Sequence, residues 1–297
     1  MLINDSYSPD TLASYLRWFT KFSNFCSQVG QIAIPASGEC LELFIAQCFK
    51  EGYRDCTIRA ALSAISYHHT INRQVAPIKS ARINRLLRGI KKAGPVKDKL
   101  LPIRYGLLKQ MVGFSHKIHS NYERALVRVA LLLMYHGCLR VGEIANSHSA
   151  KHTLNIDGLK VISKKGTPCF LKLTLNSHKH SLEPISCRIA SVKGDLCPVQ
   201  AALHYTRLRG SSPGPFLRMK SGKDVSRAYL ANKLKFLIKQ TGRDTALYNT
   251  HSIRCGRATD MAIAGIPELV IKRTGRWKSN AYLRYVRFDN FVVPRAR

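Results

Sequence analysis

The chain has 297 residues, 45% of them hydrophobic, so it can bury a sizeable core and is long enough for two domains. Its 48 Lys and Arg against 17 Asp and Glu give a formal net charge of +31. That excess favours a polyanionic partner, above all nucleic acid, over a small acidic substrate. Membrane insertion is excluded, because the longest apolar run, Val129 to Tyr135, is far shorter than the roughly 20 residues of a spanning helix, and no membrane partner is expected.

Cysteine usage and the first residues of the chain favour an intracellular protein. The start, Met-Leu-Ile-Asn-Asp-Ser, does not resemble a secretory signal. The nine cysteines form no CxxC pair, and most are expected to be buried thiols. Neither His116 with His119 nor His178 with His180 has partner ligands at a suitable spacing. We therefore expect no metal site.

The first hundred residues are predicted to be helical. Ser8 and Pro9 give the N-cap and first position of a helix whose apolar residues repeat at helical spacing up to Gly30. Further helices are expected at 37–50, at 57–70 with Thr57 as its cap, and at about 80–92. Together they predict a helical N-terminal domain at 1–93, followed by a linker at 94–103 that opens on Gly94 and Pro95.

The helix at 80–92 has one cationic and one apolar side. Ile83, Leu86, Leu87 and Ile90 occupy the apolar side, which suits packing on the helical domain. Residues 59–99 carry ten basic residues against one acid, a net of 10 − 1 = +9. We therefore expect the opposite side to contact DNA phosphates through Arg82, Arg85, Arg88 and Lys92.

The remainder, 104–297, is predicted to be a mixed α+β domain. Helices are expected at 104–115 and 122–136. Short β-prone runs at 159–162, 170–175 and 185–189 predict a small antiparallel sheet of about three strands. Helices then resume at Pro198, near Ser226, after Thr250, at Pro267 and after Ser279. The expected fold class is mainly α, with this small sheet in the second domain.

Several residues of the second domain could carry chemistry. His251 and Arg254 share one face of the first turn of a helix, whose N-terminus favours an anion. Arg140 follows an apolar helix, and Glu143 is its expected partner. Trp277 precedes Tyr282 and Tyr285, which are expected on a short helix.

In order and together, these residues resemble the tyrosine recombinase (phage integrase) family, whose pattern is Arg, Lys, His-x-x-Arg, His or Trp, and Tyr. The matching segments include G-C-L-R-V-G-E-I at 137–144 and T-G-R-W-K-S-N-A-Y-L-R-Y-V-R at 274–287. Residues 251–287 are similar to Cre recombinase. Residues 196–199 and 275–282 are similar to the recombinases of eukaryotic DIRS-type retroelements and cryptons, so a mobile element is the expected source.

The resemblance implies an N-terminal core-binding domain and a C-terminal catalytic domain that close as a clamp around duplex DNA. It implies that Tyr285 attacks phosphorus to form a 3′-phosphotyrosine, while Arg140 and Arg254 stabilise the charge on the phosphate. His251 would exchange a proton with the nucleophile or donate to the phosphate, and Lys179 would protonate the leaving 5′-hydroxyl. Trp277 would contact the phosphate, and Glu143 would support Arg140. Neither ATP nor another cofactor is required.

Some assignments remain open. Tyr282 competes with Tyr285 as nucleophile, and Lys164 or Lys165 competes with Lys179. Relatives often assemble a homo-tetramer on paired DNA sites through a C-terminal helix, but only 12 residues follow Tyr285. A type IB topoisomerase or a non-catalytic DNA-binding protein of recombinase descent are the alternative functions. The expected compartment is intracellular, and nuclear if the host is eukaryotic.

Overall fold

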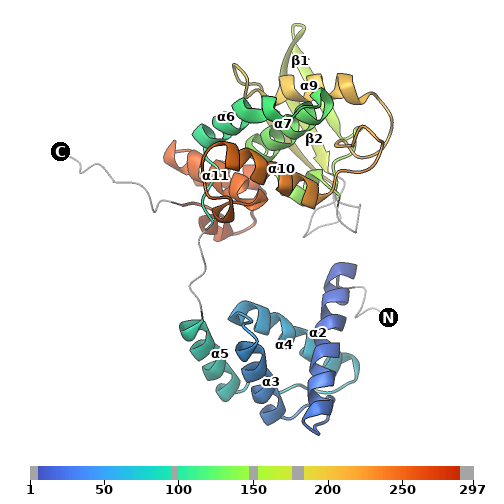
Figure 1. Cartoon of the computed structure of the whole chain (residues 1–297), viewed down its shortest axis with the longest axis vertical. Coiled ribbons are helices and arrows are strands. Elements are labelled where there is room, and N and C mark those ends of the chain that lie inside the picture. Colours follow the sequence, from blue (N-terminus) through green and yellow to red (C-terminus); the bar gives the residue numbers. More distant parts are fainter. Residues whose placement is uncertain (1–5, 95–99, 147–152, 176–183, 288–297) are drawn as a thin grey trace, which may run out of the picture. The chain divides into compact units, whose positions relative to one another are not determined.

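The computed structural model describes residues 6–94, 100–146, 153–175 and 184–287 (Figure 1). The chain divides into two compact units, Met1–Lys97 and Asp98–Arg297. The first is entirely helical over its described residues, and the second combines helices with one small sheet. The predicted mainly α fold class is confirmed. The predicted closure of two domains around DNA stays a prediction.

Over residues 6–94, the first unit contains four helices: α2 (Pro9–Gln28), α3 (Gly38–Lys50), α4 (Asp55–Ile71) and α5 (Ala81–Ala93). Ser8 caps α2 as predicted, with its side chain accepting from the Thr11 N–H at 3.2 Å. The predicted cap at Thr57 is wrong. The N–H groups of Thr57 and Ile58 already donate to the Arg54 carbonyl at 3.0 Å, so α4 has begun before Thr57.

The predicted two-sided character of α5 is present in the structure. Ile83, Leu87 and Ile90 are buried in the core of the first unit, beside Phe44 and Ile58. The side chains of α5 that are exposed include all four expected DNA contacts, Arg82, Arg85, Arg88 and Lys92. One of them is paired, because Arg82 forms an ion pair of 2.9 Å with Glu42 of α3. The sequence could not show this acid, which comes from another helix.

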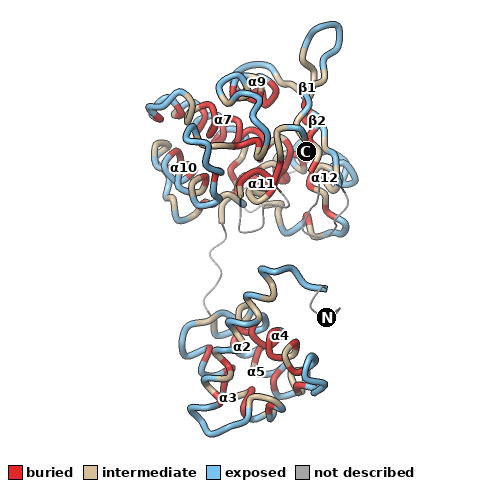
Figure 2. The backbone as a smooth tube through the Cα atoms, turned by 90° about the vertical axis from the view of Figure 1, so that its right-hand side faces the viewer, coloured by how far each residue is buried: buried red, intermediate tan, exposed pale blue. Residues whose placement is uncertain are grey.

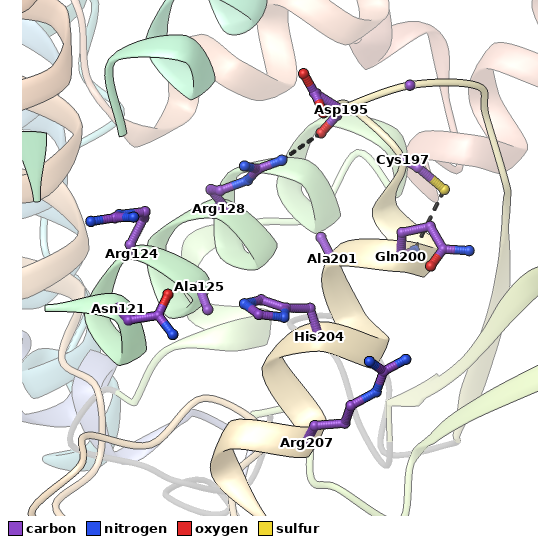
Figure 3. Close-up of a pocket in the computed structure, with 11 residues that line it drawn as sticks. Asn121, Arg124, Ala125, Arg128, Asp195, Cys197, Gln200, Ala201, His204 and Arg207 are labelled. Carbon is purple, nitrogen blue, oxygen red and sulfur yellow. Dashed lines mark hydrogen bonds between the residues drawn. The ribbon is translucent and has the colours of Figure 1, made fainter. Parts of the chain in front are cut away.

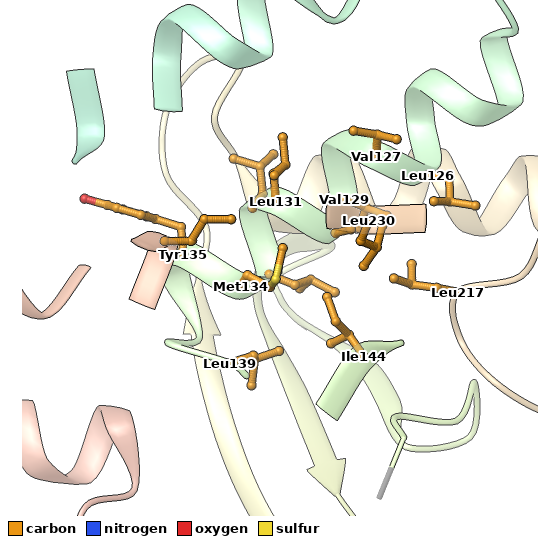
Figure 4. Packing of buried hydrophobic residues seen from close by; sticks show 14 of the residues in the cluster. Leu126, Val127, Val129, Leu131, Met134, Tyr135, Leu139, Ile144, Leu217 and Leu230 are labelled. Carbon is orange, nitrogen blue, oxygen red and sulfur yellow. The ribbon is translucent and has the colours of Figure 1, made fainter. Parts of the chain in front are cut away.

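The second unit is built around α7 (Asn121–His136), which has ten buried residues (Figures 2 and 4). Ser120 caps α7, and its apolar side chains form the centre of a core that includes Leu139, Ile144 and Leu230. The surrounding elements before the sheet are α6 (Tyr105–Gly113), the 3₁₀ helix η1 (Phe114–Lys117) and α8 (Val141–Ile144). Those after it are α9 (Pro198–Arg209), α10 (Arg227–Gln240), η3 (Thr245–Leu247), α11 (Thr250–Ile263), α12 (Glu268–Gly275) and η4 (Asn280–Arg284).

The three predicted strands form an antiparallel sheet in the order β1-β2-β3: β1 (Leu159–Lys164), β2 (Thr167–Leu175) and β3 (Ile185–Ala190). Leu171 pairs with Ile189, and Leu173 pairs with Cys187. Alternate residues of β2, Leu171, Leu173 and Leu175, are buried in the core of this unit. Every second residue of β2 therefore points into the core, as the alternation of side chains along a strand requires.

Residues 101–103, placed in the predicted linker, are bonded to the second unit. The Leu101 N–H donates to the Leu247 carbonyl, and the Ile103 N–H donates to the Ser252 carbonyl, both at 2.8 Å. The Ile103 side chain is fully buried. This segment lies against the first turns of α11, where a Cβ at Gly256 would collide with the Ile103 carbonyl.

The prediction that most cysteines are buried can be compared with the structure. Six of the nine cysteines are buried, as expected. Across 6–94, 100–146, 153–175 and 184–287, no helix combines the length and apolar character that crossing a membrane requires. Within the same ranges, no three His, Cys, Asp or Glu side chains are grouped so as to hold a metal ion.

Candidate active site

Arg140 and Glu143 form the first part of the site, just after α7. The chain leaves α7 through Cys138, which has a left-handed backbone (φ 47°), and Arg140 is the N-cap of α8. Glu143 is 4% exposed. One of its oxygens accepts from the Arg140 N–H at 2.8 Å, and the other accepts from Arg140 Nη1 at 3.1 Å. The expected Arg140–Glu143 pair therefore forms, and it fixes the guanidinium against the start of α8.

Arg276 is a further member of this cluster that the sequence did not indicate. It follows α12 with a left-handed backbone (φ 57°), and its side chain is 3% exposed. Its Nη2 donates to Glu143 Oε2 at 2.6 Å, and its two terminal nitrogens also reach the carbonyls of Gly137 and Cys138. In the sequence it is one of four cations between 272 and 278, and nothing distinguishes it from the others.

Arg254 lies on α11 and is 1% exposed. Asn249 caps this helix, so its first turn begins directly before His251. Arg254 Nη1 donates to the Cys138 carbonyl at 2.8 Å and Nη2 donates to the Gly275 carbonyl, while its buried Nε has no partner among the described residues. Burial lowers the pKa of Arg254, and the charges of Arg140 and Arg276 lower it further. The carbonyl of Cys138 thus holds two guanidinium groups, those of Arg254 and Arg276.

Tyr285 is surrounded by the other predicted site residues. Its half-buried ring lies 4.8 Å from the His251 ring and 4.8 Å from the Trp277 ring, between centroids. The Arg254 guanidinium lies 5.2 Å from the centre of the same ring. Just beyond, the Arg287 N–H donates to Thr259 Oγ1 at 3.0 Å, which ties the chain after Tyr285 to α11.

Tyr282 has different surroundings. It is 8% exposed and packs with Ala258 and Met261, and its ring centroid is 6.3 Å from that of Trp277. The expected short helix is η4, a 3₁₀ helix that ends at Arg284. Tyr285 therefore lies just past it, and the expectation that both tyrosines are inside one helix is wrong.

Trp277 connects the parts of this cluster. It is 8% exposed, and its ring lies 4.5 Å from the Arg254 guanidinium. A Cβ at Gly275 would collide with this ring, so a glycine is needed there for the indole to pack. The indole N–H is buried and has no hydrogen-bond partner among the described residues.

Comparison with known proteins adds fold-level similarity. The sequence matches no protein-family model and no curated protein. The XerH site-specific recombinase bound to its difH substrate has a TM-score of 0.63 and 17% identity, covering 95% of this chain and 76% of the other. The Tn1549 transposon integrase in complex with transposon right end DNA has a TM-score of 0.63 and 12% identity, covering 95% and 92%. A lambda integrase dimer bound to a COC′ core site has a TM-score of 0.57 and 11% identity, covering 96% and 79%.

This chain has the tyrosine recombinase fold. The residues of this chain that match the recombinase pattern come from four separate segments of the sequence. Five of them, Arg140, His251, Arg254, Trp277 and Tyr285, lie in or beside one cluster, although 145 positions separate the first from the last.

The recombinase pattern also contains a lysine, for which Lys179, Lys164 and Lys165 are the candidates. Lys179 lies outside the described residues. Lys164 and Lys165 lie at the β1–β2 turn, where Lys165 and Gly166 have left-handed backbones. Cys187 pairs with Leu173. Burial raises the pKa of the Cys187 thiol; the charge of Arg276 lowers it and that of Glu143 raises it, both by less. Six residues of β2 separate Leu173 from the turn at Thr167, about 20 Å along the strand.

Proposed function

We propose that the chain is a site-specific DNA recombinase or integrase that cleaves and rejoins duplex DNA through a 3′-phosphotyrosyl intermediate on Tyr285. The observation that carries the proposal is the position of the Tyr285 ring, which lies against His251, Trp277 and the Arg254 guanidinium. The net charge of +31 and the fold similarity to DNA-bound recombinases agree with it.

In the cleavage step, the Tyr285 phenolic oxygen forms a bond to phosphorus, and the bond between phosphorus and the 5′ oxygen breaks. The phenolic proton passes to His251 or to solvent, and the leaving 5′ oxygen takes up a proton. The reverse reaction with a 5′-hydroxyl from a second strand gives recombination. The ester energy is kept in the phosphotyrosine, so the cycle needs no ATP.

Arg140 and Arg254 are assigned to the negative charge that grows on the non-bridging oxygens. Each is held by protein groups before substrate arrives: Arg140 by the Glu143 carboxylate, and Arg254 by the carbonyls of Cys138 and Gly275. Donors fixed in advance stabilise a transition state without a reorganisation cost. The unpartnered indole N–H of Trp277 is a third donor, which cannot transfer protons.

Lys179 is assigned as the acid for the leaving 5′-hydroxyl. In the sequence it follows β2, whereas Lys164 and Lys165 precede that strand. Cys187, whose thiol the charges of Arg276 and Glu143 affect, pairs with Leu173, which is two residues before the end of β2 at Leu175 and six after its start at Thr167. A homo-tetramer on paired DNA sites is part of the same proposal and is tested separately, by the stoichiometry of the DNA complex.

The test uses a library of nicked duplexes, because the target site is unknown. Wild type is expected to form complexes that survive detergent, and sequencing the attached strands identifies the site. Tyr285→Phe is expected to bind duplex normally and form no covalent complex. Tyr282→Phe is the matched control and is expected to keep the adduct, because its hydroxyl belongs to a buried packing residue.

Three outcomes separate the alternatives. An adduct that persists in Tyr285→Phe and disappears in Tyr282→Phe would move the nucleophile. An adduct with no exchange between two DNA sites would favour a topoisomerase. Duplex binding without any adduct in wild type would favour a non-catalytic DNA-binding protein.

A further inference from the structure

A cationic groove runs between α7 and α9, away from the candidate active site (Figure 3). It has a volume of about 550 Å³. One wall is the face of α7 with Asn121, Arg124 and Arg128, and the other is the face of α9 with His204 and Arg207. The small side chains of Ala125 and Ala201 face the space between the helices, so the hollow is not filled by the core.

The two arginines of α7 are held in place without a carboxylate. Arg124 donates through Nε and Nη2 to the Ile118 carbonyl, at 3.3 and 3.1 Å. Arg128 donates through Nη2 to the Asp195 backbone carbonyl at 2.9 Å. Over the described part of the chain, no ion pair to Asp or Glu is found for either. Both are only partly exposed, so their charges are partly desolvated and uncompensated.

A second hollow of about 560 Å³ adjoins the groove and is lined by the same two arginines. The two hollows share Arg124, Arg128, Gly194 and Asp195. Among the described residues that line them, Asp195 is the one acidic residue. The cationic or imidazole side chains around the pair are Lys109, His116, Arg124, Arg128, Lys193, His204 and Arg207. Together the two hollows form a cationic track that is longer than a single phosphate requires. A phosphodiester strand, in which the negative charge repeats, would match its length.

This track is not the cleavage site. Arg124 and Arg128 lie twelve and eight residues before His136, about 18 and 12 Å along the axis of α7, and Arg140 lies beyond that end. The track also uses α9, which contributes no residue to the cluster around Tyr285.

We propose that the α7–α9 groove binds the phosphate backbone of a second DNA segment, one that is not cleaved in the same subunit. Guanidinium groups anchored by carbonyls keep further N–H groups in a fixed geometry, which suits the paired oxygens of a phosphate. A bound phosphate would also compensate charges that no carboxylate of the described residues neutralises. The inference goes beyond the proposed function and does not depend on the chemistry at Tyr285.

The test measures how fast diethyl pyrocarbonate modifies individual histidines of the full chain. His204 lies in the groove and reports its occupancy, while His251 lies beside Tyr285 and reports the cleavage site. Both are exposed. Three probes are added in turn: an intact DNA duplex, inorganic tripolyphosphate, and a poly-glutamate peptide of equal charge.

We expect the duplex to protect both histidines, with His204 requiring the higher concentration. At about nine times the dissociation constant of the groove, modification of His204 should slow about tenfold. Arg207→Glu should reduce this protection below about twofold. Lys235→Glu, on the exposed side of α10 and outside both hollows, makes the same charge change and should leave protection of His204 unchanged.

Four results would overturn the proposal. They are protection of His251 without protection of His204, protection of His204 by tripolyphosphate alone, equal protection by poly-glutamate, and equal loss in Arg207→Glu and Lys235→Glu. The second would assign the groove to a free polyphosphate, and the third to an acidic protein. Failure of the recombinase assignment would appear instead as absence of a covalent adduct, with protection of His204 unaffected.

Discussion

Replacing Arg276 with methionine tests the buried cluster that holds the two site arginines. The side chains of Arg276 and Glu143 are 3% and 5% exposed, so the substitution leaves a carboxylate in the core with only Arg140 as its charged partner. Breaking a buried ion pair costs about 3 to 5 kcal/mol, and the remaining contact to Arg140 favours the lower figure. The Gly137 carbonyl also loses its donor, which adds about 1 kcal/mol. We expect the second unit to lose about 4 kcal/mol of stability.

The two tryptophans allow this loss to be assigned to one unit. Trp18 lies in the first unit and Trp277 in the second, so in a Trp18→Phe background the fluorescence during urea unfolding reports the second unit alone. Arg273→Met, on the exposed side of α12, is the control and should change the unfolding free energy by less than about 0.5 kcal/mol.

A double variant separates charge from packing. Arg276→Met combined with Glu143→Gln should be more stable than Arg276→Met alone, because it removes the unpaired buried charge. The reasoning is refuted if Arg276→Met costs no more than Arg273→Met, or if the Gln substitution only adds to the loss.

Three further predictions concern other parts of the chain. Changing Arg82, Arg85 and Arg88 together to Gln should reduce the slope of log affinity for duplex DNA against log salt by up to about 3, since each phosphate contact contributes about 0.9; an unchanged slope would mean that this side of α5 is only solvated. Gly256→Ala should destabilise the second unit by collision with the Ile103 carbonyl, whereas Gly106→Ala, which meets no atom within 4 Å, should be neutral or stabilising in the same urea assay. Burial lowers the pKa of His136 from 6.5 to about 4, so the folded state favours the neutral ring. The stability that the neutral ring contributes is therefore present above pH 6.5 and is lost as the pH falls towards 4. Between pH 7 and pH 5 the second unit should lose about 2 kcal/mol from this group, and His136→Phe should remove that part of the pH dependence.

Helix positions were predictable where their signals are local. Ser8 with Pro9, Ser226 and Pro198 all mark helix starts in the structure, because a cap or a first-turn proline acts within its own turn. The prediction that Thr57 caps a helix is wrong, and the reason is also local. It has a good capping side chain, but the turn after Gly52 already places Arg54 in the extended conformation of an N-cap.

The candidate site was predictable only through residues that the recombinase pattern contains. The role of Arg276 depends on two left-handed residues, Cys138 and Arg276 itself, which bring its guanidinium to Glu143 across 133 positions of sequence. Neither is a glycine, so composition gave no sign of an unusual backbone. The tie between Arg287 and Thr259 is hidden in the same way, because a backbone donor has no residue signature.

The segment at 101–103 decides where the polypeptide can be divided for biochemical work. A fragment that begins at Arg104 would leave the carbonyls of Leu247 and Ser252 without their donors and would uncover the buried site of Ile103, directly over the helix that bears His251 and Arg254. Such a fragment could lose DNA cleavage for reasons unrelated to the missing N-terminal helices. Dissection of the two units is therefore interpretable only with a cut before Leu101.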